Sequence, residues 1–503
     1  MSVSQSVSWF FPELLLAFGA LAVLVVDLLV TKHRKKIAVV IGGLFVLLAL
    51  LKSESAASEH SGVVALFSGM VVLDPMAFFF KLIFGIAVLV TLFFVYRSAE
   101  SPEANSGEFV TLLVAVTLGL FLMGAASDMV MMYLSLEFVS LCSYVMAGWS
   151  RKDRRSTEAA LKYVIYGGVA SGVMVYGMSL LYGLTGKTNL FEIRDALAAS
   201  APSQLALTLS VVLIIAGIGF KIAAVPFHMW CPDVYEGAPT PVTAFFSVGP
   251  KAAGFAMMIR FFYTTFVDAT SWGSGTELVA VGGAPWPLLV GIIAAATMTL
   301  GNFAAITQNN LKRLLAYSSI AHAGYMLMGI ASMSRQGVES VLFYLGVYLF
   351  MNLGAFLVVI AIRDHTEGEG IEAYRGLSQR QPFAAVLMTV FLLSLTGVPP
   401  FAGFIGKFYL FAAVLAKGGF YYYLLAIIGI LNSAVSLFYY ARIIRAMFLE
   451  EPVVRAPVGL PLPYRVALVA LAVPTVVLGI FPPLLSDLTQ VSVGALGVVT
   501  TGF

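Results

Sequence analysis

Long apolar runs alternate with short polar connections along the whole chain, and this pattern predicts a bundle of membrane-spanning helices. A helix needs about 20 predominantly apolar residues to cross the hydrocarbon core of a bilayer. The run at 37–51 is short, and the run at 382–416 is too long for one straight span and is interrupted by Pro399-Pro400. We therefore predict about fourteen transmembrane helices, at 9–30, 37–51, 76–96, 109–126, 128–149, 162–184, 205–230, 241–266, 286–306, 313–332, 339–362, 382–416, 421–448 and 464–485.

Composition supports an all-α integral membrane protein. The chain has 503 residues, of which 60% are hydrophobic and 11% charged, and its mean hydropathy is +0.94. A soluble domain has about 25% charged residues, so this chain has too little polar surface to cover a water-exposed globule. The first basic cluster, Lys32 to Lys36, follows the first apolar run, which argues against a cleaved signal peptide and predicts that the first helix stays in the membrane.

The distribution of lysine and arginine predicts how the helices are oriented. Of the 29 basic residues, nineteen lie in or beside odd-numbered connections, five in even-numbered ones and five inside spans. Basic residues concentrate on the cytoplasmic side of membrane proteins, so both termini are expected outside the cytoplasm. The third connection is the least clear, because Arg97 shares it with the acidic residues Glu100, Glu103 and Glu108.

Eight ionisable residues fall inside the predicted spans, although each costs at least about 2.5–3.5 kcal/mol at the centre of a bilayer. Four of them stand near helix ends, where a side chain reaches the headgroup region or snorkels toward it, and they need no functional explanation. These four are Glu13, Asp27, Lys81 and Arg260.

The remaining four, Glu137, Lys221, Lys251 and Lys407, are candidates for proton translocation. An ion pair between Glu137 and one lysine would be a purely structural explanation, but it would leave two lysines unexplained. Burial in a water-poor bundle makes a lysine release its proton more readily, whereas a nearby carboxylate stabilises the charged form. Movement of Glu137 relative to Lys221 would therefore switch the lysine between holding and releasing a proton.

Two predicted helix breaks lie close to these lysines. Pro226 follows Lys221 by five residues, and Pro399-Pro400 precedes Lys407. Proline interrupts the hydrogen bonds of a helix, and non-helical backbone at membrane depth is tolerated where protein or water lines it. Interrupted segments in the two halves of a chain indicate a transport site, although proline and glycine are common in transmembrane helices.

Other chemistry is poorly represented. His228 and His322 lie inside spans and are candidate proton relays or, equally, satisfied core residues. Neither belongs to a set of metal ligands, and Cys142 and Cys231 form no CxxC motif for zinc or an iron–sulfur cluster. GFIGKF and GIGFKI resemble nucleotide-binding motifs but lack required residues. We expect no cofactor and no metal site in this chain.

Five segments carry a family resemblance, and they spread over most of the chain. They are LEFVSLCSYVMAGW, RRSTEAALKYVIYGG, GFKIAAVPFHMWCPDVYEGAPTPVTAFFSVGPKAAGFA, NNLKRLLAYSSIAHAGYMLMG and LTGVPPFAGFIGKF. With these segments the chain resembles subunit N of complex I (NADH-quinone oxidoreductase), one of its antiporter-like membrane subunits. The run DVYEGAPTPVTAF followed by PKAAG is more similar to subunit N than to the related subunits L and M.

The resemblance implies two inverted five-helix repeats, each with a broken helix, and a proton path along a polar mid-membrane axis. It implies N-terminal helices in 1–105, a first repeat in 106–267, a second in 268–450, and a last helix and tail in 451–503. It makes Glu137 the helix-5 glutamate, Lys221 its helix-7 partner, Lys251 the helix-8 connecting lysine and Lys407 the helix-12 lysine.

The resemblance also implies partners and a location. The partners would be the other membrane subunits of complex I, including L and M, while flavin, iron–sulfur clusters and quinone would belong to partner subunits. The expected location is the inner membrane of a bacterium, crossed many times.

Three functions remain to be distinguished. The first is a proton-translocating subunit of a complex I type enzyme, which couples quinone reduction elsewhere in the complex to proton pumping. The second is a subunit of a multisubunit Na⁺/H⁺ antiporter, which works without electron transfer. The third is a structural scaffold, which predicts that all four buried ionisable residues tolerate neutral substitution.

Overall fold

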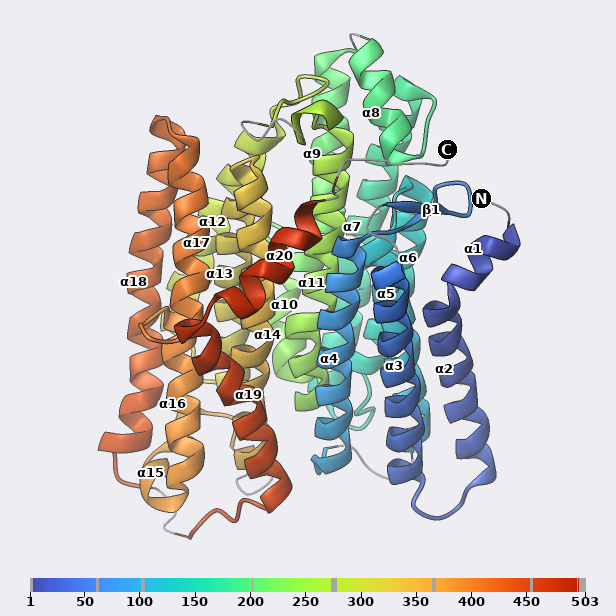
Figure 1. Cartoon of the computed structure of the whole chain (residues 1–503). Coiled ribbons are helices and arrows are strands. Elements are labelled where there is room, and N and C mark those ends of the chain that lie inside the picture. The colour runs from blue at the N-terminus through green and yellow to red at the C-terminus, as the bar shows by residue number, and fades with distance from the viewer. Residues whose placement is uncertain are drawn as a thin grey trace.

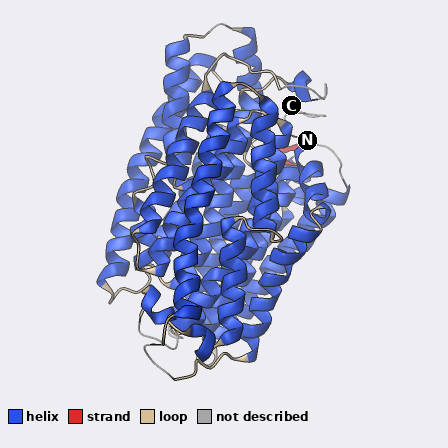
Figure 2. Cartoon of the chain, turned by 90° about the vertical axis from the view of Figure 1, so that its left-hand side faces the viewer, coloured by secondary structure: helices blue, strands red, loops and turns tan. Residues whose placement is uncertain are grey.

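The chain folds into a single bundle of long helices with one small β-hairpin (Figures 1 and 2). The computed structural model describes residues 3–59, 63–100, 105–200, 202–272, 278–363, 368–452, 456–494 and 496. The end of the tail predicted in 451–503 lies outside these described residues.

The predicted membrane spans correspond to long helices. Within the described residues, thirteen helices are long and apolar enough to cross a membrane. The run at 382–416 is divided into α16 (Pro382–Thr396) and α17 (Ala402–Lys417), which supply a further crossing as a broken pair. The thirteen helices are α2 (Phe11–Leu29), α3 (Arg34–Glu59), α4 (Pro75–Arg97), α5 (Ser106–Ala125), α6 (Met129–Ala147), α7 (Arg154–Thr185), α9 (Gln204–Ile222), α11 (Thr240–Thr265), α12 (Trp286–Ile306), α13 (Leu311–Ala331), α14 (Arg335–Arg363), α18 (Phe420–Leu449) and α19 (Leu462–Ile480).

Hydropathy did not predict the shorter elements. Strands β1 (Val64–Leu66) and β2 (Val71–Leu73) pair antiparallel, with Ala65 opposite Val72. The predicted spans at 205–230 and 464–485 each run past the end of a helix, because α9 stops at Ile222 and α19 at Ile480. The remaining elements are α1 (Val3–Trp9), α8 (Leu190–Ala199), α10 (Trp230–Gly237), η2 (Ala269–Trp272), η3 (Ile371–Tyr374), α15 (Leu377–Arg380) and α20 (Pro483–Gly494).

Side chains at the helix ends explain where several helices begin and stop. Asp74 caps α4 by accepting a hydrogen bond of 2.7 Å from the Ala77 amide, and Pro75 follows at the first helical position. Asn310 caps α13 in the same way, through the Arg313 amide. Gly186 ends α7 in the left-handed conformation that glycine adopts without strain.

The centre of the bundle is formed by α11 and α14, which Figure 1 shows between the two lateral groups of helices. Every residue of α11 is buried. Helices α19 and α20 lie diagonally across the bundle and pack against α14 (Figure 1). The outer helices expose apolar side chains such as Leu28, which is 76% exposed. A wholly buried apolar helix inside and lipid-compatible helices outside are typical of a membrane bundle.

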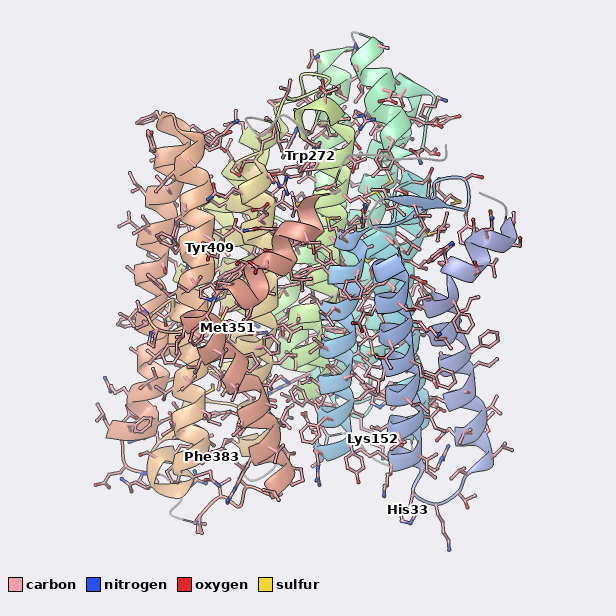
Figure 3. The ribbon with its side chains drawn as sticks, viewed as in Figure 1. His33, Lys152, Trp272, Met351, Phe383 and Tyr409 are labelled. Carbon is pink, nitrogen blue, oxygen red and sulfur yellow. The ribbon has the colours of Figure 1, made fainter. Side chains whose placement is uncertain are left out.

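The connections that the charge pattern groups together lie at the same end of the bundle. His33 and Lys152, from the first and fifth connections, lie at one end, and Trp272, from an even-numbered connection, lies at the other (Figure 3). We call the end with His33 and Lys152 the basic end. Glu100 is compatible with this end because it forms an ion pair of 2.6 Å with Arg363.

Candidate functional site

Lys221 is fully surrounded by protein at the end of α9. Its side chain is 1% exposed, and Nζ donates a hydrogen bond of 3.1 Å to Ser140 Oγ on α6. Glu137 lies one turn earlier on α6, on the same face as Ser140, and its charge interacts with that of Lys221. The structure therefore brings Glu137 and Lys221 together, but the ammonium donates to Ser140 rather than to the carboxylate. One carboxylate oxygen of Glu137 is buried and has no hydrogen-bond partner among the described residues.

The α9 helix breaks directly after Lys221. Ala223 ends it in the left-handed region, with φ of 59°, and its amide still bonds back to the last turn. Pro226 lies in the non-helical stretch that follows, as predicted. The indole of Trp230 closes the break by donating to the Phe220 carbonyl at 3.0 Å. His228 lies in this stretch, 8% exposed, and within the part of the chain that the structure describes its Nδ1 has no hydrogen-bond partner.

Lys251 lies on α11 near the middle of the bundle. It is 2% exposed, and Nζ donates to Ser319 Oγ on α13 at 2.6 Å. The ammonium also lies 5.7 Å from the centre of the Tyr235 ring, which is within the range of cation–π attraction.

His322 lies on α13 one turn after Ser319. Nδ1 forms a hydrogen bond of 2.6 Å with the Tyr344 hydroxyl, and Nε2 lies 3.3 Å from the Tyr440 hydroxyl. The imidazole interacts electrostatically with both Lys251 and Lys407. His322 thus belongs to the polar core, where it bonds to hydroxyl groups of α14 and α18.

Lys407 lies on α17, just after the second helix break. It is 3% exposed, and Nζ donates to the Thr396 carbonyl at 2.8 Å and to Ser433 Oγ at 3.0 Å. The centre of the Tyr325 ring is 4.7 Å from the ammonium. The break itself begins at Gly397, with φ of 89°, and contains the predicted Pro399 and Pro400.

The two broken helices hold their lysines in a related way. Lys221 belongs to the last turn of α9, whereas Lys407 comes from the far side of its break and reaches back to the last residue of α16. The carboxyl end of a helix carries a partial negative charge that stabilises a nearby cation. The Lys407 ammonium is therefore bound at the carboxyl end of the first half-helix, whereas Lys221 belongs to the last turn of its first half-helix and its ammonium binds Ser140 on α6.

Three of the four charges that we expected to reach the headgroup region, Glu13, Lys81 and Arg260, are instead paired inside the protein, whereas Asp27 pairs with the part-exposed Arg34 at the end of its helix. Glu13 and Lys81 form an ion pair of 2.6 Å, with side chains 1% and 2% exposed. Arg260 binds Asp74 through two nitrogens, at 2.8 and 3.0 Å, and also donates to the Gly124 carbonyl. Hydropathy measures depth along one helix and carries no information about a partner on another.

Sequence analysis also missed a charged cavity at the basic end. It has a volume of about 240 Å³ and lies where the start of α7 meets α10 and α13. Lys162 and Arg313 both bind Asp233, each at 2.6 Å, and Arg313 also binds Glu236. Asp233 and Glu236 lie in the DVYEG run, which contributed only to the family resemblance. The run contains both carboxylates, but it does not show which basic residues pair with them.

The described residues contain no group of three or more histidine, cysteine, aspartate or glutamate side chains that could hold a metal ion. Both cysteines, Cys142 and Cys231, are buried and unpaired with each other. The groups near the two helix breaks and on α11 and α13 include lysines, Glu137, His322 and hydroxyls, all of which can exchange protons.

Comparison with known proteins identifies the family. Residues 126–435 match the family described as NADH:quinone oxidoreductase/Mrp antiporter, TM. The chain is 51% identical to NADH-quinone oxidoreductase subunit N of Anaeromyxobacter sp. (strain Fw109-5), over 95% of this chain and 94% of the relative. The chain belongs to the subunit N family of NADH-quinone oxidoreductase. It is also 48% identical to subunit N 2 of Sorangium cellulosum (strain So ce56), over 95% of both chains.

Solved structures agree with this membership. A chain of respiratory complex I from Thermus thermophilus matches with a TM-score of 0.78 and 30% identity, covering 95% of this chain and 99% of that one. A chain of the Mrp complex from Dietzia sp. DQ12-45-1b matches with a TM-score of 0.82 over 99% and 98% of the two chains. Its identity is 22%, so this second likeness shows a shared fold alone. The subunit N family and the Mrp antiporter share the bundle described above.

Proposed function

We propose that this chain is the proton-translocating membrane subunit of a complex I type NADH-quinone oxidoreductase, and that Glu137, Lys221, Lys251 and Lys407 carry the proton. The observation that supports this most strongly is the row of three lysines, each at most 3% exposed, whose ammonium groups donate to hydroxyl or carbonyl oxygens. Buried intramembrane charges mark ion pathways by default, and the chain belongs to a family named for a proton-coupled enzyme.

Hydroxyl groups provide the links between the charged residues. A serine or tyrosine hydroxyl both donates and accepts, so Ser140 and Ser319 can pass a proton that their lysine releases. His322, bound to two tyrosine hydroxyls, is the candidate relay between Lys251 and Lys407. His228 is the candidate relay beside the first break, because its Nδ1 is buried without a partner.

Electrostatic coupling between neighbouring charged residues would pass the effect of electron transfer along the row of lysines. Each lysine is easier to deprotonate when its neighbour is charged, and Lys221 holds its proton more firmly when Glu137 is close. A disturbance at one end of the row therefore propagates as alternating uptake and release. Moving one charge against the membrane potential costs about 2.3 kcal/mol per 100 mV, which electron transfer elsewhere in the complex must supply.

The redox parts of the reaction belong to other chains in this proposal. Flavin, iron–sulfur clusters and quinone would be held by partner subunits, and the antiporter-like subunits L and M would be neighbours in the membrane. The two inverted repeats would occupy 106–267 and 268–450, with one helix break each, at Pro226 and at Pro399-Pro400. The basic end would face the cytoplasm of a bacterium and both termini the opposite side of its inner membrane, in keeping with the excess of lysine and arginine.

Exchange of Na⁺ for H⁺ is the competing function, and the shared fold with the Mrp chain is compatible with it. The identity favours the redox complex, since it is 51% to a complex I subunit and 22% to the Mrp chain.

The test replaces Lys221 or Glu137 by alanine in the complex. We expect normal assembly and a large loss of protons pumped per electron transferred, because the first transfer step is removed. Lys152→Ala is the matched control, since this lysine is exposed at the basic end (Figure 3). Normal pumping by an assembled Lys221→Ala complex would contradict the proposal, and Na⁺ exchange without redox partners would favour the antiporter.

A further inference from the structure

We infer that the ring of Tyr325 acts as the counter-charge of Lys407 and sets how firmly that lysine holds its proton. The inference rests on the proposed function, because it assigns a positioning residue to one step of the same proton path. It predicts a consequence that packing alone would not have, namely a shift in the pH dependence of pumping.

The geometry places the ring face against the ammonium. Lys407 Nζ lies 4.7 Å from the centre of the Tyr325 ring, closer than the 5.7 Å between Lys251 and the Tyr235 ring. Tyr325 is 1% exposed and Lys407 3% exposed, so water does not screen the contact. The negative face of an aromatic ring attracts a cation most strongly under such desolvated conditions.

A carboxylate does not take this role. Among the described residues no ion pair involves Lys407, whereas Lys221 has Glu137 on the neighbouring helix α6. Of the helices packed against α17, α16 has no titratable side chain, whereas α13, α14, α18 and α19 have several. The one carboxylate in these helices is Glu339, near the start of α14, and it pairs with Arg335. The Tyr325 ring packs edge-on against His322, with 5.9 Å between the ring centroids.

A buried amide network fixes the ring. Asn302 is fully buried and donates to the Tyr325 hydroxyl at 3.3 Å and to Asn432 at 3.2 Å. The Tyr439 hydroxyl donates to the other atom of the same amide at 3.0 Å. Three helices, α12, α13 and α18, thus hold Tyr325 in place. The cation–π contact depends on the position of the Tyr325 ring, and this network holds the ring firmly. Among the described residues, Lys407 has no carboxylate partner, and it binds the carbonyl group beside the second helix break.

The physical consequence follows from the difference between the two protonation states. The ring attracts the ammonium and is indifferent to the neutral amine. A desolvated cation–π contact is worth about 2 kcal/mol, which corresponds to about a thirtyfold change in proton affinity or about 1.5 pH units. Without the ring, Lys407 would lose its proton at a lower pH and would be empty over part of the working range.

The test measures protons pumped per electron transferred against pH, in the assembled complex reconstituted in vesicles. Tyr325→Leu, which removes the ring, is expected to move the alkaline limb of the profile down by about 1.5 pH units. Tyr325→Phe keeps the ring and is expected to leave the limb nearly in place. Tyr409→Leu is the matched control, because Tyr409 lies on α17 two residues from Lys407 and packs against Phe343 instead.

A second series keeps the shape of the side chain. Phenylalanines with one, two and three ring fluorines at position 325 withdraw charge from the ring face, and each added fluorine is expected to lower the limb further. This series decides the question where Tyr325→Leu fails to assemble. Profiles that coincide across the series would overturn the inference. Lys407→Met separates the two claims, since pumping unaffected by Lys407→Met overturns the proposed function, and pumping lost there with coincident Tyr325 profiles overturns the inference alone.

Discussion

At the residue scale, the buried charges of this chain fall into two groups with different partners. Glu13, Lys81, Asp74 and Arg260 form direct ion pairs, and the three core lysines bind hydroxyl or carbonyl oxygens. A direct ion pair holds both charges fixed, whereas a lysine on a neutral oxygen keeps the choice between its two protonation states. The first group therefore suits structure and the second suits proton transfer.

The pair between Arg260 and Asp74 is expected to stabilise the contact of α11 with α4. Asp74→Asn leaves the buried guanidinium uncompensated, which costs on the order of 3–5 kcal/mol. Heating the complex in the presence of a thiol reagent measures the loss, because Cys142 and Cys231 are buried and react when the fold opens. We expect labelling at a markedly lower temperature.

The control for this prediction is Lys187→Ala. Lys187 and Glu192 form an exposed pair, with side chains 50% and 45% exposed, and exposed pairs contribute about 0–1 kcal/mol. Equal labelling temperatures for the Asp74 and Lys187 variants would show that the buried pair is dispensable.

At the scale of elements, the sequence predicted both helix breaks and did not predict how they end. Pro226 and Pro399-Pro400 can be identified directly in the sequence, and proline interrupts a helix locally whatever its tertiary surroundings. The left-handed residue that terminates the first half of the earlier break, Ala223, is not predictable in the same way, because alanine rarely adopts that conformation, whereas glycine, as at Gly397, commonly ends a helix so. Strands β1 and β2 were missed because three residues are too few for a periodicity.

The two left-handed positions give opposite predictions. Ala223→Gly relieves backbone strain and is expected to be neutral or to stabilise the fold by up to about 1 kcal/mol. Gly397→Ala imposes that strain, with φ of 89°, and its added Cβ would lie 2.9 Å from Lys407 Cδ. We expect it to lower the thermal stability by about 1–3 kcal/mol and to reduce pumping by displacing the lysine.

Thiol labelling on heating and pumping assays on the same two complexes check this pair. We expect Gly397→Ala to be less stable than Ala223→Gly. The prediction is contradicted if Gly397→Ala changes neither stability nor pumping, or if Ala223→Gly lowers them more.

At the scale of the whole molecule, hydropathy and charge counting predicted the bundle well, because the bilayer imposes one length and one polarity on every span. His33 and Lys152, which belong to two odd-numbered connections, lie at the same end of the bundle, as expected (Figure 3). The third connection was the exception, and Glu100 explains it through its ion pair with Arg363 on α14. We predicted that Glu137 and Lys221 lie close together. The spacing of residues could not predict that the Lys221 ammonium donates its hydrogen bond to Ser140.

The last prediction concerns the charge cluster that ties the basic end together. Glu369 binds Arg363 and Lys312. Lys312 in turn donates to the Ala238 carbonyl at the end of α10, and Arg363 donates to the Thr240 hydroxyl at the start of α11, so the cluster joins α11, α13 and α14. Burial alone would raise the pKa of Glu369, but Lys312, Arg363 and Asn310 outweigh it and lower the pKa below its ordinary value of 4.5. A carboxyl group with a lowered pKa stabilises the fold above the pKa of the unfolded chain, and this stabilisation disappears as the pH falls through the folded value.

Glu369→Gln should therefore lower the thermal stability at pH 7 by an amount on the order of 3–5 kcal/mol, because Lys312 loses its carboxylate partner, and should flatten the decline of stability as the pH falls below the ordinary value of 4.5. Loss of helical circular dichroism on heating, at pH 7 and at several pH values below 4.5, gives both quantities for the wild type and the variant. Glu339→Gln is the control, because Glu339 pairs with the exposed Arg335 and should leave the pH dependence unchanged. Parallel pH curves for the wild type and Glu369→Gln would mean that other carboxylates cause the acid sensitivity, and that the cluster joins three helices without depending on this charge.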